Sequence, residues 1–278
     1  MKLCLLAALL LLLSLPGALF AASSPRPEPE KQFFDLGLTL SRGAFAYAPL
    51  AKQAAVVEKT SNKIAQVRQL SRLDPLAGKS RAEAHARMDR AVALMRRLHA
   101  PEAAVAPVAA AAARLAGPLP LPADAQSLAF FSRPAARTVA SLTEFQILSS
   151  LPEDPAVRRW LHAPDLPSSA SLWYSAGALA GLSEIAAAHE MPDLLPPPAQ
   201  VFADLRRLRD GLARLAPMPP EASTIRKEMD AFLTNAPPGP AAGTRTLSPV
   251  QLQALAGISR RLQLQLSASP VGQETAGR

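Results

Sequence analysis

The chain has 278 residues, of which 49% are hydrophobic and 5% aromatic, and it carries a formal net charge of +8. Its only cysteine, Cys4, lies at the very start, so the rest of the chain cannot form disulfides, thiolate metal sites or cysteine nucleophiles. The length allows one or two domains with substantial cores.

The first 21 residues predict a secretory signal peptide. Lys2 supplies a positive start, Leu3 to Leu15 form an apolar run, and Pro16-Gly17 ends it. This run is shorter than the roughly 20 residues that a membrane-spanning helix needs. We expect cleavage after Ala21 and a mature protein in the periplasm or secreted. In the alternative, an uncleaved segment acts as a membrane anchor.

Proline-rich stretches divide the rest of the chain. Residues 22–32 are expected to be a disordered leader and residues 33–116 an N-terminal basic helical hairpin region. A proline-rich linker at 117–127 precedes a C-terminal helical bundle at 128–267, and 268–278 are expected to be a disordered tail.

The N-terminal region predicts two helices, at roughly 50–73 and 80–99, that pack antiparallel. Asp74-Pro75 and Gly78 interrupt the pattern between them, and Ser80 with Glu83 has the spacing of a capping box. The inward residues of the second helix would be Met88, Ala91, Met95 and Leu98, facing Val57, Ile64 and Leu70 of the first.

Helix starts and apolar stripes are also clear in the C-terminal region. Asp154-Pro155 and Ser248-Pro249 each place a capping residue before a proline at the first helical position. The most regular stripe, on a helix from about Pro198, is Val201, Leu205, Leu208, Leu212 and Leu215, and another is Leu252, Leu255, Ser259, Leu262 and Leu266.

A helix rich in small residues is predicted from about Ser169 to His189. Its Gly177 and Gly181 would let another helix backbone approach closely, either in a soluble core or as a membrane dimer face, and Glu184 favours the soluble packing. Because evidence for strands is thin, the sequence predicts an all-α fold, an irregular bundle of about seven to nine helices with proline-rich connections.

Catalytic chemistry is not indicated. None of the four histidines forms a metal-binding pair, and His85 with Asp89 on one helix face is interpreted as a surface hydrogen bond. Nucleophile elbows, phosphate loops and dinucleotide motifs are absent from the sequence. We therefore expect a protein that is not an enzyme and uses neither a cofactor nor a metal, with an unfamiliar hydrolase as a remote alternative.

Charge is distributed unevenly along the chain. Residues 63–97 carry +6 and residues 141–193 carry −5, which can attract partners or pair within the fold. The candidate partner-binding residues on the outer surface are Arg81, Arg87, Arg90 and Arg97. Because aromatic residues do not interleave with these bases, nucleic acid is not an expected partner.

These observations predict an exported, non-enzymatic helical interaction protein of the bacterial cell envelope. It would be a scaffold, accessory subunit or chaperone-like binder that recruits an acidic protein through its basic surface. The alternative is a peripheral membrane-associated protein, held by an uncleaved N-terminal anchor or by anionic lipid.

Overall fold

The computed structural model describes residues 29–121, 132–213, 220–235 and 246–267, and these residues form helices and no strand. The all-α prediction is confirmed for this part of the chain. The predicted signal peptide, most of the leader, the end of the linker and the tail lie outside the described residues. In chain order the elements are α2 (Pro29–Ala44), α3 (Ala48–Glu58), α4 (Lys63–Arg72), α5 (Asp74–Arg97), α6 (Glu102–Ala116), α8 (Arg133–Leu148), η1 (Leu151–Glu153), α9 (Pro155–Leu161), α10 (Ala170–His189), η2 (Pro192–Leu194), α11 (Pro198–Ala213), α12 (Pro220–Thr234) and α13 (Pro249–Ser267).

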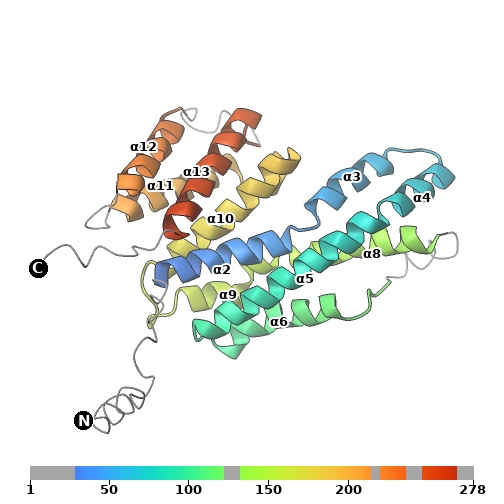
Figure 1. Ribbon diagram of the computed structural model, residues 1–278, viewed down its shortest axis with the longest axis horizontal. Helices are drawn as coiled ribbons and strands as arrows, with labels where there is room; N and C mark the ends of the chain where they lie inside the picture. Colours follow the sequence, from blue (N-terminus) through green and yellow to red (C-terminus); the bar gives the residue numbers. More distant parts are fainter. Residues whose placement is uncertain (1–28, 122–131, 214–219, 236–245, 268–278) are drawn as a thin grey trace, which may run out of the picture.

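The centre of the fold is the close crossing of α2 and α10 (Figure 1). A Cβ added to Gly37 would lie 2.0 Å from the Tyr174 carbonyl oxygen, and one added to Gly177 would lie 2.0 Å from that of Phe34. Only glycine lets the two backbones come so near. The buried helix predicted over 169–189 is therefore present, and Gly177 packs within the core of the molecule.

One large hydrophobic core includes residues from both sides of the proline-rich break. It joins Phe34 and Met95 before the break to Tyr174, Leu208 and Leu255 after it. Helix α2 begins at Pro29, so residues 29–32 of the predicted leader are helical. Among the helices that the structure describes, none combines the length and apolarity required to cross a membrane.

Two predicted helix starts are confirmed by their capping contacts. Asp154 accepts a hydrogen bond from the Ala156 amide at 2.8 Å. Ser248 Oγ accepts from the Gln251 amide at 3.3 Å while Gln251 Oε1 accepts from the Ser248 amide at 3.0 Å, which is a reciprocal capping box.

The α11 stripe is confirmed as core. Its members Val201, Leu205, Leu208 and Leu212 are buried, and Leu215 lies outside the described residues. The stripe on α13 is buried from Leu252 to Leu262, and Leu266 packs at its edge.

The predicted antiparallel pairing of 50–73 with 80–99 is wrong. Asn62 accepts hydrogen bonds from the Ile64 and Ala65 amides and starts α4, so the first segment divides into α3 and α4. Helix α4 packs on α8, where Val57 and Leu70 form a small cluster with Ala135. Helix α5 packs mainly on α2 and α6.

The predicted break between the two segments is also placed differently. Helix α5 already begins at Asp74, because Pro75 fits the first turn of a helix, where its missing N–H costs nothing. Gly78 lies inside the helix, and Ser80 is buried, so Ser80 does not cap a helix start.

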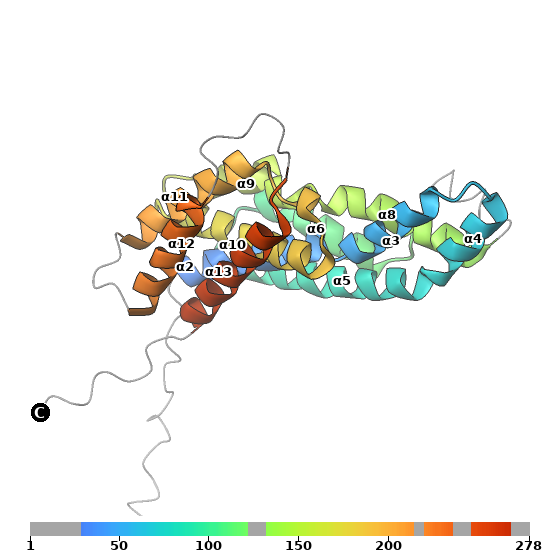
Figure 2. The ribbon, with the colours of Figure 1, turned by 90° about the horizontal axis from the view of Figure 1, so that it is seen from above.

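Helices α3 and α4 form an arm that extends from the body of the molecule, alongside the beginnings of α5 and α8 (Figures 1 and 2). Both views place the α3–α4 connection near the outer end of this arm. We use "the arm" for residues 48–80 and 132–140. Helices α11 and α13 pack on α10, and α12 packs on α11 and α13, away from the arm.

Candidate binding surface on helix α5

The outward face of α5 carries basic residues at helical spacing. Its opposite face is buried through Ala84, Met88, Ala91 and Met95, so α5 presents a long outer stripe to solvent. We define the α5 stripe as Lys79, Glu83, Ala86, Arg90, Ala93 and Arg97, all exposed and three or four positions apart. Three bases and one acid give the stripe a positive charge.

Arg87 borders the α5 stripe and pairs with its one acid. Arg87 Nη2 lies 3.7 Å from Glu83 Oε1, with the acid one turn N-terminal to the base. Such a half-exposed pair stabilises a helix by only a few tenths of a kcal/mol. Arg90 and Arg97 form no ion pair with any described residue, so their charges face solvent.

The carboxyl group of Asp35 on α2 is close enough to Arg90 for the positive charge of Arg90 to act on it. Burial raises the pKa of Asp35, and the nearby charges of Lys31 and Arg90 oppose this rise. No contact as short as an ion pair joins Asp35 to Arg90 among the described residues. Arg90 therefore remains able to bind an external carboxylate.

The expectation that Arg81 lies on the outer surface is wrong. Its side chain is 19% exposed, its Nε lies 3.1 Å from Glu144 Oε2, and its Nη2 donates to the Arg114 carbonyl oxygen at 2.9 Å. Arg81 thus joins α5 to α8 and to the last turn of α6. A guanidinium there also compensates the partial negative charge of a helix C-terminus.

Glu144 is the buried partner of Arg81 and is 3% exposed. Its Oε2 also accepts a hydrogen bond from the Tyr47 hydroxyl at 2.6 Å, whereas its Oε1 has no hydrogen-bond partner among the described residues. Burial, and the contact with Glu144, raise the pKa of Tyr47. The tyrosine therefore stays protonated and keeps donating.

The sequence carries a local signal for this buried pair. Arg81 lies three and seven residues before the core residues Ala84 and Met88, so it falls on the inward face of α5. Glu144 is four residues from Ala140 and Leu148, both of them buried. Opposite charges on the inward faces of two helices predict a buried pair.

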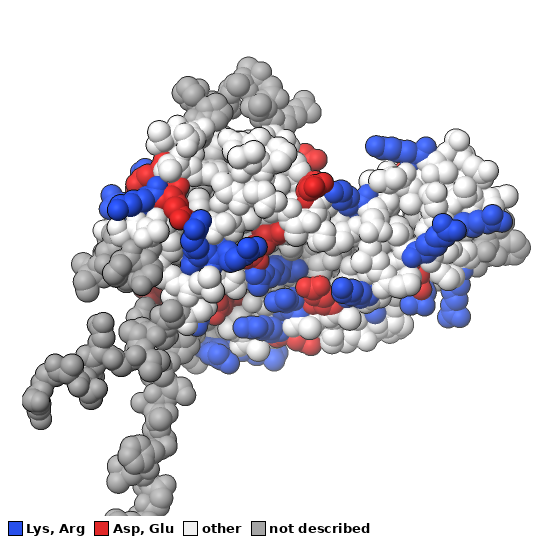
Figure 3. All heavy atoms as spheres, turned by 45° about the horizontal axis from the view of Figure 1, so that its top comes forward, with Lys and Arg blue, Asp and Glu red and all other residues white. Residues whose placement is uncertain are grey.

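Most acidic residues of the 141–193 stretch form ion pairs within the fold. Glu184 pairs with Arg42, Glu190 with Lys52, and Glu153 with Arg158. Within the described residues, Arg81 with Glu144 is the one ion pair that joins this stretch to the basic stretch 63–97. On the face shown in Figure 3, acidic and basic side chains lie together over the body, while the arm shows bases with few acids.

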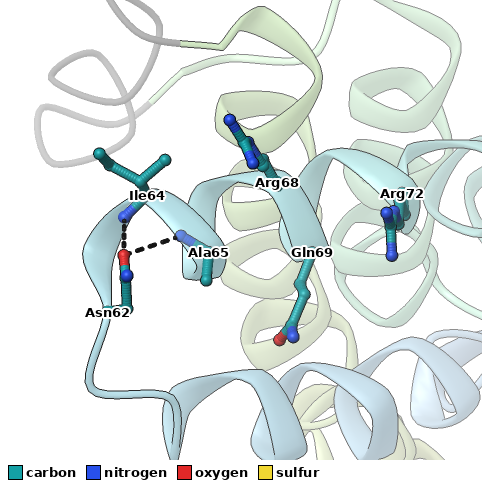
Figure 4. A pocket seen from close by; sticks show the side chains of 6 residues that line it. All are labelled: Asn62, Ile64, Ala65, Arg68, Gln69 and Arg72. Atoms are coloured by element: carbon teal, nitrogen blue, oxygen red, sulfur yellow. Dashed lines mark hydrogen bonds between the residues drawn. The ribbon is translucent and has the colours of Figure 1, made fainter.

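A shallow hollow of about 250 Å³ lies on the outer side of α4, in the arm. It is lined by Asn62, Ile64, Ala65, Arg68, Gln69 and Arg72, and Figure 4 shows all of these side chains along one helix and its cap. Arg68 and Arg72 are one turn apart and exposed, and neither forms an ion pair with a described residue. A single helix and its cap therefore supply the whole lining of this hollow.

A larger hollow of about 540 Å³ lies between the α5–α6 turn and α9. Its lining is mostly apolar, with Trp160 among Leu98 and Leu166, and its polar members are His99, Arg159 and Asp165. These polar groups form no hydrogen bond or ion pair with one another, so the hollow lacks an oriented nucleophile and base. Among the described residues, no group of His, Cys, Asp and Glu could hold a metal ion.

Two of the histidines form side-chain contacts within the fold. His85 Nε2 lies 3.2 Å from Asp89 Oδ2 on one face of α5, in agreement with the predicted surface contact. His162 Nε2 lies 3.3 Å from Ser171 Oγ, and His189 ends α10.

No family model, no curated protein and no solved structure matches this chain. The function of the chain is therefore inferred from the charge, exposure and contacts of its own surface.

Proposed function

We propose that this chain is an exported, non-enzymatic helical interaction protein of the bacterial cell envelope, which recruits an acidic partner protein through the basic outer surface of α5. The observation that carries the proposal is that Arg90 and Arg97 are exposed along the α5 stripe and have no ion pair among the described residues. Arg87 contributes at the edge of this surface, where its pair with Glu83 is weak and easily exchanged.

A rigid scaffold supports these arginines. The inward face of α5 is held by α2, α6 and α8, and Met88 and Met95 are fully buried. The backbone of α5 therefore does not need to order on binding, and only the exposed side chains lose conformational freedom. This lowers the entropic cost of association. Charge complementarity of this kind steers encounters and selects partners of opposite sign.

The test is the triple substitution Arg87→Gln, Arg90→Gln and Arg97→Gln. The purified wild-type and variant chains are used to capture partners from envelope extract over a series of salt concentrations, with mass spectrometry of what they retain. We expect the wild type to retain an acidic protein at low salt and to lose it as salt rises, since exposed charges are screened within about 8–10 Å at physiological ionic strength. The variant should lose that protein at every salt concentration.

The matched control is the triple substitution Arg206→Gln, Arg226→Gln and Arg260→Gln on α11, α12 and α13. These arginines are exposed and form no ion pair with a described residue, so the change in net charge is identical. Retention of the same partner by both triple variants, or equal loss by both, would overturn the assignment to α5. Identical melting temperatures of the three chains confirm that the fold is unchanged.

A further inference from the structure

We infer that the end of the arm is a second binding surface, separate from the α5 stripe, and that it contacts an anionic lipid membrane. The surface consists of Lys59 directly after α3, and of Lys63, Ile64, Arg68 and Arg72 on α4. It does not depend on the proposed α5 function, because the two surfaces share no residue.

Charge is the first observation. Residues 56–72 contain four basic residues and one acidic residue, Glu58, which gives a net charge of +3. Helix α4 itself contains no acid. Lys59, Lys63, Arg68 and Arg72 are all exposed, and none forms an ion pair with a described residue. Basic residues close to an anionic bilayer each contribute roughly 1 kcal/mol of binding free energy.

An exposed apolar side chain is the second observation. Ile64 is 67% exposed, although it is a β-branched aliphatic residue. It lies in the first turn of α4, next to the α3–α4 connection, and lines the same hollow as Arg68 and Arg72. Apolar side chains beside bases are typical of surfaces that insert into the boundary between headgroups and acyl chains.

Shape is the third observation, and it favours lipid over protein. The α3–α4 connection is near the outer end of the arm in both ribbon views (Figures 1 and 2). The hollow beside Arg68 and Arg72 is lined by α4 and its cap alone (Figure 4), so it offers no groove for a peptide or helix. A projecting end can meet a plane of headgroups without a complementary groove. The long stems of its lysines and arginines can cover acyl chains while their charges remain in the headgroup layer.

The contacts that hold α4 in place do not involve the side chains that would touch lipid. Asn62 fixes the start of α4, and Ser71 and Thr138 link α4 to α8 through hydrogen bonds with Ser132 and the Leu70 carbonyl oxygen. Substitution of Arg68, Arg72 or Ile64 removes none of these contacts. The fold should therefore tolerate variants at these positions.

The experiment measures co-sedimentation of the purified full chain with vesicles of phosphatidylcholine alone and of phosphatidylcholine mixed with phosphatidylglycerol. We expect binding only to the mixed vesicles, and weaker binding as salt rises. Substituting Arg68→Gln and Arg72→Gln should weaken the vesicle partition coefficient by roughly fivefold per arginine, about 25-fold for the pair. Ile64→Ser should weaken it severalfold with no change in net charge.

Two matched pairs of substitutions serve as controls. Arg206→Gln on α11 with Arg260→Gln on α13 removes two exposed arginines that form no ion pair with a described residue, far from the arm, and Arg90→Gln with Arg97→Gln tests the α5 stripe. Both should bind mixed vesicles nearly as well as the wild type. If only the variant with Arg90→Gln and Arg97→Gln lost vesicle binding, α5 would be the lipid-binding surface, and this inference would be overturned.

Three other outcomes would also overturn the inference. One is failure of the wild type to bind mixed vesicles. Another is an equal loss in the variant with Arg206→Gln and Arg260→Gln, which would indicate that only net charge matters. The third is arm-dependent binding of an acidic protein with no vesicle binding, which would assign the arm to a protein partner. Failure of the α5 capture experiment, by contrast, leaves the arm unaffected.

Discussion

Gly37 and Gly177 oppose one another at the α2–α10 crossing, and each lies against the backbone of the other helix. A Cβ on either would come within 2.0 Å of a carbonyl oxygen, Tyr174 O for Gly37 and Phe34 O for Gly177. Backbone atoms cannot rotate away as a side chain can. The separation of the two central helices is therefore set by these two glycines.

We expect Gly177→Ala to destabilise the protein by at least the roughly 1–3 kcal/mol typical of overpacked cores, because α2 and α10 must move apart. The control is Gly78→Ala in α5, where an added Cβ would meet nothing within 4 Å. That variant should be more stable by about 0.8–1 kcal/mol, the helix preference for alanine over glycine. Urea unfolding of both variants measures the difference, and equal stability of Gly177→Ala and the wild type would contradict the crossing.

Leu208→Ala should destabilise the protein by about 2–5 kcal/mol, the usual range for a buried leucine, since Leu208 lies in the core on α11. Leu264→Ala on α13 is the matched control, because that leucine is 64% exposed. Its effect should stay within about 0.5 kcal/mol. If both variants lost the same free energy of unfolding, Leu208 of α11 would not be part of the core.

Arg81→Met should cost about 3–5 kcal/mol, because it leaves the Glu144 carboxylate buried with Tyr47 as its remaining partner. Adding Glu144→Leu to this variant should recover part of the loss, since the unpaired charge is removed. Arg90→Met, at an exposed arginine without an ion pair, serves as the control. Thermal melts compare the four chains, and equal effects of Arg81→Met and Arg90→Met would show that the buried pair is not formed.

The pH dependence of stability should include a contribution from Asp35. Burial raises the pKa of Asp35, so the folded chain binds this proton more readily than the unfolded chain. The associated stability is present below the unfolded pKa of about 4 and is lost as pH rises through the folded pKa. Asp35→Asn should therefore increase stability at pH 7, by an amount that shrinks toward pH 4. The control is the exposed Asp193→Asn, and a gain that grows toward pH 4 would contradict this reasoning.

If the chain is exported as proposed, mass spectrometry of the mature protein should show an N-terminus at Ala22. Ala21 offers the small residue that a signal peptidase accepts, with Leu19 at the −3 position, and cleavage after Ala22 or Ser23 would preserve the prediction of export. A mature species that keeps Met1 to Leu15 would instead favour the membrane anchor.

Local signals in the sequence predicted local structure well. Asp154 and Ser248 cap helices as their spacing with the following prolines indicated, and the stripe from Val201 to Leu212 is buried. These features depend on residues three or four positions apart, which a single helix brings together. The cap at Asn62 is also local, but Thr60, Ser61 and Asn62 are three consecutive residues that could each cap a helix.

Pairings between helices were predicted less well, because they depend on distant segments. Gly177 indicated a close helix contact, but its sequence could not identify Gly37 as the opposite residue, 140 positions away. The same limit applies to the candidate site. Periodicity places Arg90 and Arg97 on the outer face of α5 and Arg81 on its inner face. The pairing of Arg81 with Glu144 on α8, by contrast, depends on a contact between distant segments.

The α2–α10 crossing has a consequence for the order in which the chain folds. Arg42 on α2 and Glu184 on α10 are 142 residues apart in sequence, so the central contacts have high contact order and are expected to form slowly. During synthesis α2 emerges long before its partner. For a chain exported as proposed, the α2–α10 part of the core could form only after α10 has passed through a translocation channel. Folding would then be completed on the far side, once α10 arrives.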